Sequence, residues 1–380
     1  MNAVLLYSEE LARFDYGKDH PFKPVRARKT LELCDRYNLL ERPGVALRAP
    51  GKATLEDLAR FHTRRYLEAL QSIEQGLFEP WMLAFGLGTE ENPLLPHLLE
   101  WSKAVAGGTL TGLVLLQEGA RRVFHLVGGC HHAGPDRAEG FCYVNDVCIG
   151  ILKALDSGFR RIAYVDIDAH HGNGVQDAFY RDDRVLVVSL HETGRCLYPW
   201  SGFETELGEG AGAGYNVNIP LEPGTDDEIY EMAFDRIVPP LLERFAPDLL
   251  VAQLGADTLV SDPLTHLKLT NNAYRSVVRK LAASAPRVLA LGGGGYDVYR
   301  TARCWTLAWC ELAGLEPEDS FAGLVGGMMF GPEMEVGSLY DRPYVSRGEA
   351  RDLAWREADR VCAYLERHLF PLWGLSGSSP

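Results

Sequence analysis

A short apolar run that ends in two acids and two histidines constrains this chain more than any other feature. Residues 162–165 are apolar, and Asp166, Asp168, His170 and His171 follow before two glycines. Alternate residues of an extended chain share a face, so Asp166, Asp168 and His170 should point the same way. A helix cap needs only one such side chain, whereas buried acids need a partner. The stretch therefore predicts a buried strand with a metal site at its carboxyl end.

Apolar strands and helices alternate along the rest of the chain. We expect strands at residues 3–7, 123–127, 162–165, 185–190, 215–219, 249–254 and 288–291, and helices at 29–40, 96–117, 145–158, 175–180, 272–283 and 298–312. A further helix should start near Thr225, with Pro239 and Pro240 kinking or interrupting it. This alternation predicts an α/β fold, a mostly parallel central sheet flanked by helices on both faces, in a single domain without a linker.

In such sheets ligands bind beyond the carboxyl ends of the strands. Unusual residues follow four of the expected strands: His131 and His132, the stretch around Asp168, Asp257, and Tyr296 after four glycines. We expect these four loops to converge on one site.

The bulk composition excludes several classes of protein. A net charge of −14 argues against nucleic acid and anionic membranes as partners. The eight cysteines form no C-x-x-C pair, which indicates reduced thiols. The first residues lack a basic leader and no apolar run is long enough to span a bilayer. We expect a cytoplasmic protein, and the sequence does not decide its oligomeric state.

One histidine and two aspartates make a three-ligand site with an open fourth position, which is typical of catalytic zinc, with Fe²⁺ and Mn²⁺ as alternatives. Water activated there needs a base, and the leaving group needs an acid. His131 and His132 are the candidates, with Asp166 and Asn173 as their partners. The glycines before Tyr296 would let the backbone approach a ligand and present the phenol to an oxyanion.

Five motifs together resemble the histone deacetylase superfamily. They are GGCHHAGPDRAEGFCYVND, YVDIDAHHGNGVQ, VVSLHETG, QLGADTLVSDP and LGGGGYDVYRTARCW, in that order. The class I-like bacterial members known as acetoin utilisation proteins are the most similar branch. The match runs from about Arg26 to Trp305. It implies an arginase/deacetylase-like fold, with a catalytic domain over residues 1–373 and a disordered tail over 374–380.

The resemblance implies zinc-dependent hydrolysis of the acetyl amide of N-ε-acetyl-lysine in proteins, for instance on a cytoplasmic acyl-CoA synthetase. The implied zinc ligands are Asp168, His170 and Asp257. The implied catalytic residues are His132 as base and then acid, His131 paired with Asp166, Asn173 beside His132, and Tyr296 as the oxyanion donor. The implied substrate-binding residues are Glu91, Gly140, Phe141, Tyr198 and Leu264.

The resemblance also implies two structural potassium ions. The first would lie near Asp166, Asp168, His170, Ser189 and Leu190, and the second near Phe179, Asp182, Val185 and Tyr215. Two positions depart from the class I pattern. Asn173 stands where class I members have Asp, as in class II, so we expect a less basic His132. Cys130 stands where Leu or Trp is common, so the floor of the pocket should differ.

Three other functions remain alternatives. An acetylpolyamine deacetylase can carry an acidic gate about seven residues after the last metal-binding Asp, and here that position is Leu264. A catalytically silent acyl-lysine binding module is disfavoured because every catalytic position is filled. A ureohydrolase shares the fold but needs two metals and more acidic ligands than the sequence offers.

Overall fold

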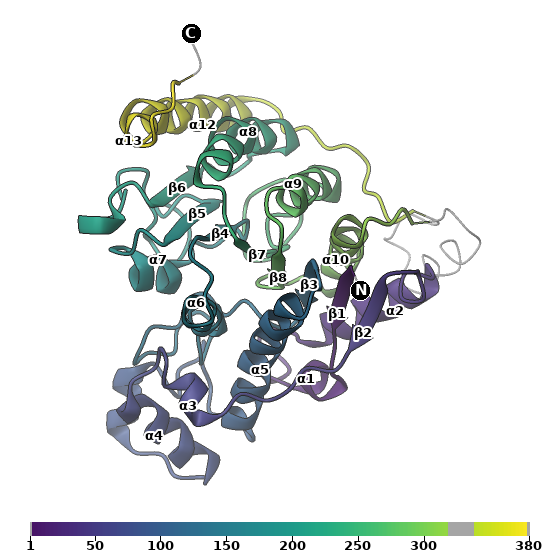
Figure 1. Cartoon of the computed structure of the whole chain (residues 1–380), viewed down its shortest axis with the longest axis vertical. Helices are drawn as coiled ribbons and strands as arrows, with labels where there is room; N and C mark the ends of the chain where they lie inside the picture. The colour runs from purple at the N-terminus through teal and green to yellow at the C-terminus, as the bar shows by residue number, and fades with distance from the viewer. Residues whose placement is uncertain (1, 318–337, 378–380) are drawn as a thin grey trace.

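A single sheet of eight strands runs through the molecule (Figure 1). The computed structural model describes residues 2–317 and 338–377. The strands are β1 (Ala3–Leu6), β2 (Val45–Arg48), β3 (Arg122–His125), β4 (Ile162–Asp166), β5 (Val185–Glu192), β6 (Asn216–Leu221), β7 (Leu249–Gln253) and β8 (Val288–Leu291). Their order is β2-β1-β3-β8-β7-β4-β5-β6, and every neighbouring pair is parallel. The expected α/β architecture is confirmed.

Helices cover both faces of the sheet (Figure 1). The helices are α1 (Glu9–Arg13), α2 (Val25–Arg36), α3 (Leu55–Leu58), α4 (Arg64–Glu74), α5 (Leu98–Gln117), α6 (Asp146–Asp156), α7 (Asn173–Phe179), α8 (Asp227–Phe245), α9 (Asn271–Ala283), α10 (Val298–Ala313), α12 (Glu349–His368) and α13 (Phe370–Trp373), with 3-10 turns η1 (Pro80–Phe85) and η2 (Gly210–Gly212). One face packs against α5, α6 and α7, and the other against α2, α8, α9 and α10. None of the helices in these two ranges is long and apolar enough to cross a membrane.

The central strands β4, β7 and β8 are almost entirely apolar because both of their faces are buried, whereas the edge strand β2 is partly exposed. In β4, Ile162 and Tyr164 belong to the core beneath α5 to α7, whereas Ala163 and Val165 belong to the core on the opposite face. Asp166 ends this strand and is fully buried. The apolar residues therefore place the strand in the centre of the protein, and the acids at its carboxyl end are buried with it.

Two local expectations were wrong. A helix was expected over 29–40, but α2 spans Val25–Arg36 and follows Pro24, which already has helical angles. Proline favours the start of a helix because its fixed φ suits the first turn. The prolines Pro239 and Pro240 do not interrupt α8, which is assigned over Asp227–Phe245. Buried residues on both sides of them hold the helix together.

The expected tail stays a prediction. Leu375 packs against the core, and its N–H donates to the carbonyl of Phe370. Residues 378–380 lie outside the described part of the chain. The expected domain boundary at residue 373 therefore has no separate structural counterpart here.

The strand order explains why the candidate residues meet. Strands β3, β8, β7 and β4 are consecutive in the sheet, and each is followed by one of the four loops singled out in the sequence. Because all four strands are parallel, their carboxyl ends lie at the same edge. The loops after residues 125, 166, 253 and 291 are thus brought together at the centre of that edge.

Candidate active site

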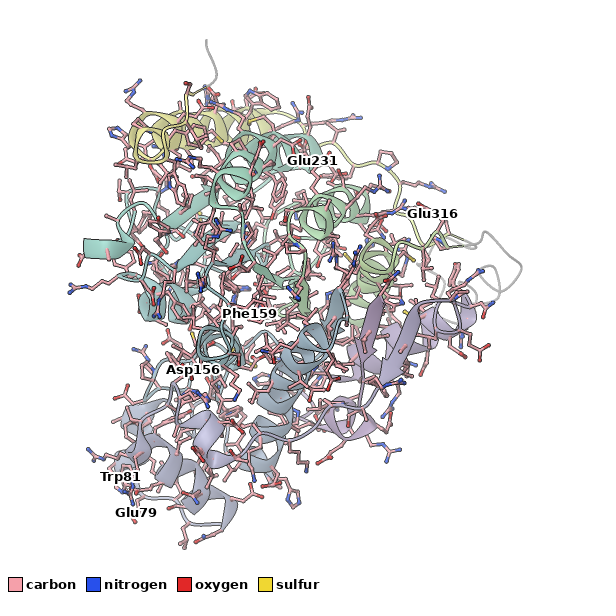
Figure 2. All side chains as sticks on the ribbon, in the orientation of Figure 1. Glu79, Trp81, Asp156, Phe159, Glu231 and Glu316 are labelled. Carbon is pink, nitrogen blue, oxygen red and sulfur yellow. The ribbon has the colours of Figure 1, made fainter. Side chains whose placement is uncertain are left out.

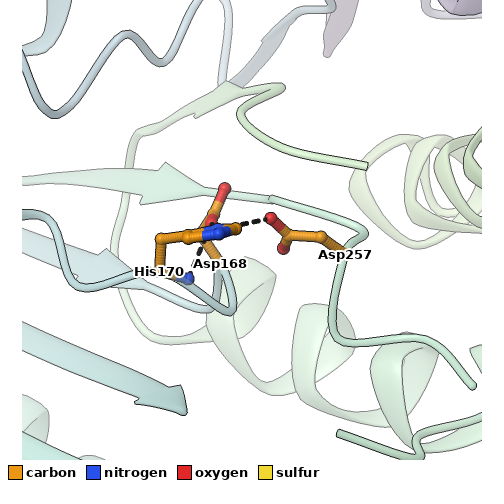
Figure 3. Close-up of side chains that lie close together, drawn as sticks. All are labelled: Asp168, His170 and Asp257. Carbon is orange, nitrogen blue, oxygen red and sulfur yellow. Dashed lines mark hydrogen bonds and ion pairs between the residues drawn. The ribbon is translucent and has the colours of Figure 1, made fainter. Parts of the chain in front are cut away.

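Three side chains from the loops after β4 and β7 meet at the centre of this edge (Figure 3). The Nδ1 atom of His170 lies 3.2 Å from Asp168 Oδ1 and 2.9 Å from Asp257 Oδ2. One potential ligand atom from each residue falls within 4.8 Å of the others, and all three residues are buried. Among residues 2–317 and 338–377, this is the one group of three His, Cys, Asp or Glu side chains so arranged.

The charges of this group suit a bound cation. Burial would lower the pKa of His170, but its contacts with Asp168 and Asp257 outweigh burial and hold that pKa well above the usual value. Burial and the neighbouring carboxylate of Asp168 raise the pKa of Asp257 to about 7. The buried carboxylates of Asp168 and Asp257 thus both interact with the single proton on Nδ1 of His170. One nitrogen and two oxygens are donors that a divalent ion such as Zn²⁺ or Fe²⁺ accepts in place of that proton.

Backbone N–H groups hold the two carboxylates in place. Asp168 Oδ2 accepts from Gly294 N at 2.6 Å, and Asp257 Oδ1 accepts from Ala169 N at 2.8 Å. A Cβ atom at Gly294 would lie 2.1 Å from Asp257 Oδ2, so no other residue fits there. Gly293 has a φ of +86°, which a residue with a side chain rarely adopts. The glycine run therefore allows the backbone to approach the acids closely.

The two adjacent histidines flank the metal-ligand group. His131 Nδ1 lies 2.8 Å from Asp166 Oδ2, and His132 Nδ1 lies 2.8 Å from Asn173 Oδ1. The sequence suggested that the two rings point in different directions, but their Nε2 atoms lie 3.1 Å apart. Asp166 also accepts from Tyr164 and from the backbone of Asp168, so it links the histidine pair to the loop that carries the ligands.

The two histidines have opposite acid–base properties. Burial disfavours a charge on His131, but the carboxylates of Asp166 and Asp168 outweigh burial and raise the pKa of His131 to about 9. Burial and the nearby charges of His131 and His170 lower the pKa of His132 well below its usual value. At neutral pH, His131 is thus a cation and His132 is a neutral imidazole, which is the form that a general base requires.

Polar groups under the histidine pair fix its loop. The carboxylate of Asp146, at the start of α6, accepts from the backbone N–H groups of Gly129 and Cys130. The amide of Asn145 donates to the carbonyl oxygens of His131 and Ala133. The loop is therefore anchored to the first turn of a helix rather than left free.

His62 supports the same loop from below. Its Nε2 accepts from the backbone N–H of Asn145 at 2.9 Å, so its Nδ1 carries the proton and donates to the carbonyl of Pro135 at 3.2 Å. Burial lowers the pKa of His62 from 6.5 to about 4. The folded protein thus holds this histidine neutral at a pH where the unfolded chain takes up a proton.

We expect His62 to make the protein acid-sensitive. As the pH falls from 6.5 towards 4, unfolded His62 binds a proton and folded His62 does not, so the free energy of unfolding falls, by up to about 1.4 kcal/mol per pH unit. Urea unfolding at pH 7, 6 and 5 measures this slope, and His62→Gln should make it shallower. The same slope in wild type and variant would show that another group is responsible.

Tyr296 faces the metal-ligand group from the glycine run. Its ring centroid lies 6.1 Å from that of His170, and burial raises its pKa well above the usual value, so the phenol keeps its proton. The backbone N–H of Tyr296 donates to Asp262 Oδ2 at 2.8 Å. The guanidinium of Arg26, which is buried, donates to the carbonyl oxygens of Gly293 and Gly295. The sequence analysis assigned no role to Asp262 or Arg26.

A narrow cavity lies between the histidine pair and Tyr296. Its free volume is about 20 Å³, enough for one or two water molecules. Its lining residues are Phe22, Val127, Gly128, Gly129, Cys130, His131, His132, Gly140, Phe141, Cys142, Asp168, Gly293, Gly294 and Tyr296. Cys130 does form part of this floor. Phe22 was not predicted, and the only hint in the sequence was its place beside Pro21.

The other predicted substrate-binding residues lie around this cavity. Figure 2 draws the described side chains as sticks on the ribbon, with side chains packed between the sheet and its helices. The rings of Phe141 and Tyr296 are 5.9 Å apart, and those of Tyr198 and His132 are 5.2 Å apart. The backbone carbonyl of Glu91 lies 3.1 Å from Nε2 of His20, and Glu91 is exposed, so it lies at the rim. The ring of His20 contacts Phe141, although His20 was not among the predicted residues.

Leu264 is partly buried, and its N–H donates to Asp262 at 2.9 Å, which places it beside Tyr296 but not in the cavity wall.

The residues predicted to hold potassium also lie close together. Asp166 and Ser189 are paired across β4 and β5, with Leu190 next to Ser189. Backbone hydrogen bonds connect Phe179 to Asp182 and Asp182 to Val185, and the carbonyl of Tyr215 accepts from the N–H of Val187, two residues after Val185. Binding of potassium at either place stays a prediction.

Comparison with known proteins gives consistent matches. The family model of the histone deacetylase domain matches residues 20–312. The chain is 37% identical to a probable histone deacetylase 19 of Zea mays over 86% of its own length, and 36% identical to the acetoin utilization protein AcuC of Bacillus subtilis over 83%. A crystal structure of an HDAC homolog complexed with SAHA is 34% identical and has a TM-score of 0.85, over 95% of this chain and 100% of that chain.

A second solved structure, an HDAC homolog from Aquifex aeolicus, has a TM-score of 0.82 at 32% identity, over 95% of this chain and 100% of that one. Coverage differs among the relatives. The chain spans 63% of the length of the maize protein but 83% of the Bacillus protein. The similarity thus covers nearly all of the shorter relatives and only part of the longer one.

Proposed function

The chain belongs to the histone deacetylase family, and from this premise we propose that it is a metal-dependent amidohydrolase that removes the acetyl group from N-ε-acetyl-lysine. The observation that carries the proposal is the meeting of Asp168, His170 and Asp257, which come from two different strands, within 4.8 Å of one another. The same edge of the sheet carries a neutral imidazole, a cationic imidazole and a phenol.

The three ligands would hold a divalent ion, with Zn²⁺ favoured and Fe²⁺ as the alternative. When bound, such an ion polarises a carbonyl group and lowers the pKa of a water from about 15.7 towards about 7. The donor set fits this role, because three protein ligands leave further coordination positions for water and substrate. The side of the group that faces the cavity also faces His132 and Tyr296.

His132 takes the proton of the attacking water. Its Nδ1–H donates to Asn173 Oδ1, so the lone pair that accepts a proton is on Nε2. A water that reaches this atom replaces the contact with Nε2 of His131. His132 then gives the proton to the leaving amine of lysine. His131 keeps its charge through Asp166 and stabilises the negative charge that develops nearby.

Tyr296 donates a hydrogen bond to the oxygen that becomes negative in the tetrahedral intermediate. Its raised pKa keeps the phenol protonated over the whole working pH range. Asp262 and Arg26 hold the peptide group that joins Gly295 to Tyr296, so the position of this donor is set before the substrate arrives. Phe141 and Tyr198 would line the methylene chain of the lysine, with Gly140 beside them and Glu91 at the rim to hold the substrate backbone.

Acetyl-lysine in a protein is favoured over an acetylpolyamine as the substrate. A second cationic group of a polyamine needs a free carboxylate at the position of the acidic gate. Leu264 supplies none, and both oxygens of the nearby Asp262 already accept backbone N–H groups, from Leu264 and Tyr296. The acetylated protein would be a cytoplasmic one, such as an acyl-CoA synthetase. Potassium would bind behind the site as a structural ion.

Removal of the metal should abolish turnover. We expect a chelator to lower the rate on an acetyl-lysine peptide by at least about a hundredfold, since no described residue replaces the ion as activator of water. Added Zn²⁺ or Fe²⁺ should restore the rate. Peptides with longer acyl chains and an acetylpolyamine, measured with and without chelator, complete the panel.

Each outcome of this panel is informative. Turnover that survives chelation would contradict the proposal. A preference for the acetylpolyamine would favour the small-molecule deacetylase instead. Metal-dependent binding of the acetyl-lysine peptide without turnover would identify a silent binding module. A His170→Ala variant, which lacks one ligand, should behave like the chelated wild type without any chelator.

A further inference from the structure

The side-chain amide of Asn173 faces Nδ1 of His132 and so bears on which ring nitrogen carries the proton. In the observed orientation Asn173 Oδ1 faces His132 Nδ1, which must then be protonated. An amide rotated by 180° would present its NH₂ group to Nδ1 instead. His132 would then carry its proton on Nε2 and would have no lone pair to offer at the cavity. An amide has no intrinsic preference between these orientations. Two contacts favour the observed one: the Nε2–H of His131, which lies 3.1 Å from His132 Nε2, and the second partner of the amide.

That second partner is Glu139. Its Oε1 lies 3.5 Å from Asn173 Nδ2, a long contact between an N–H donor and a carboxylate. An ionised carboxylate only accepts hydrogen bonds, so it attracts the NH₂ end of Asn173 and repels the Oδ1 end. The side chain of Glu139 is only 15% exposed. Charges act more strongly there than on an open surface, because less water screens them.

Glu139 is itself held in position from two sides. Its Oε2 forms an ion pair with Arg137 Nε at 2.9 Å. Its backbone forms a pair of hydrogen bonds with Cys142, of 3.0 and 2.9 Å, which closes the turn that carries Gly140 and Phe141. Asp177, the other acid that faces Glu139, has its own pKa raised by burial and by Glu206 and Glu139.

We propose that Glu139 is a positioning residue that orients the Asn173 amide and thereby keeps the Nε2 lone pair of His132 available. The consequence for catalysis rests on the role proposed above for His132. The residue types at positions 139 and 173 are chemically compatible with each other. With Asp at 173, two carboxylates would lie about 3.5 Å apart, and one of them would have to take a proton or move away. With Asn at 173, a single carboxylate acts on His132 through the amide.

Reversing the charge at position 139 tests the proposal. In Glu139→Lys the new ammonium group would donate to Asn173, rotate its amide and move the His132 proton to Nε2. We expect kcat to fall about ten- to a hundredfold with little change in KM, because the loss falls on proton transfer. Glu139→Gln should lose activity in the same direction, because Arg137 takes its one acceptor oxygen and leaves an NH₂ group facing Asn173. Asp136→Lys makes the same charge change on an exposed residue of the same loop and serves as the control.

A double variant separates orientation from damage to the turn. Asn173→Asp alone should lose activity because of repulsion from Glu139. The combination of Asn173→Asp with Glu139→Lys replaces the amide by an ion pair and should be at least about tenfold more active than Glu139→Lys alone. A double variant whose kcat is simply the product of the two single losses would overturn the proposal.

The tautomer of His132 can be read without any turnover. In ¹⁵N-histidine NMR spectra of the zinc-loaded protein, with the signal assigned by its loss in a His132 variant, we expect protonated Nδ1 in wild type and protonated Nε2 in Glu139→Lys. Protonated Nδ1 in Glu139→Lys overturns the proposal. If that variant does not fold, Glu139→Ser replaces it and should show a mixture of both tautomers, and the wild-type tautomer alone overturns the proposal. A wild type that hydrolyses no acetyl-lysine contradicts the proposed function but leaves this measurement of the tautomer valid.

Discussion

A His132→Ala variant is expected to lose about 10² to 10⁴ in kcat on an acetyl-lysine peptide, the range that a positioned general base contributes. The expectation follows from the charges around this ring. Burial and the neighbouring charges of His131 and His170 keep the pKa of His132 well below its usual value. It is therefore the neutral imidazole of the pair at physiological pH, and His131, with a pKa of about 9, cannot take its place.

Steady-state kinetics with parallel metal analysis check this expectation. His132 is not among the three proposed ligands, so the variant should retain one equivalent of metal and bind the peptide with a KM within a few fold of wild type. A His132→Ala variant with near wild-type kcat and full metal content would remove this residue from the reaction. A loss of metal together with activity would show that the ring supports the ligands rather than the proton transfer.

The sequence predicted the site better than it predicted its surroundings, and the reason is physical. Asp168 and Asp257 are far apart in the chain but meet because β4 and β7 are neighbours, with Asp166 paired to Gln253. The spacing of apolar residues along the chain indicates where strands lie, and the end of each strand indicates where polar side chains can gather at the edge of the sheet. The order of the strands in the sheet depends on the packing of the whole chain. Only the resemblance to a known family gave information about that order before the structure was known.

The local sequence pattern could not predict the burial of Arg26 or its hydrogen-bond acceptors. A charged residue in a Pro-containing polar stretch suggested a loop, yet it lies buried in α2 and donates to carbonyls on both sides of Gly294. A buried guanidinium is tolerated only when such acceptors surround it. The acceptors come from a glycine run far along the chain, with Gly295 separated from Arg26 by 269 positions. The residues within a few helical turns of Arg26 therefore give no information about these acceptors.

Helix α8 and the histidine pair illustrate the same limit. Two prolines remove backbone donors from α8, but Ile237, Val238, Leu241 and Leu242 beside them are buried, and that burial keeps the segment helical. For His131 and His132, alternation of side chains predicted divergent rings. The hydrogen bonds from their Nδ1 atoms turn the two Nε2 atoms towards each other instead. The sequence indicated the partners Asp166 and Asn173 but not the rotamers that these partners impose.

A Tyr296→Phe variant is expected to lose about 10² to 10³ in kcat, comparable to the loss of one donor to an oxyanion. The change removes a single oxygen from a partly buried ring whose backbone is fixed by Asp262 and Arg26. The phenylalanine should therefore occupy the same place. A donor that acts only on developing charge contributes little to ground-state binding, so KM should change much less than kcat.

Tyr364→Phe is the matched control, since Tyr364 lies on α12, on the outside of α8, and contacts His368 rather than the site. It should retain wild-type kcat. The pH profile gives a second measurement. Because burial and the carboxylates of Asp257 and Asp168 hold the pKa of Tyr296 well above its usual value, wild type and Tyr296→Phe should have the same alkaline limb. Unimpaired turnover by Tyr296→Phe, or a rise in KM that accounts for the whole loss, would show that the phenol only lines the pocket and that another donor stabilises the oxyanion.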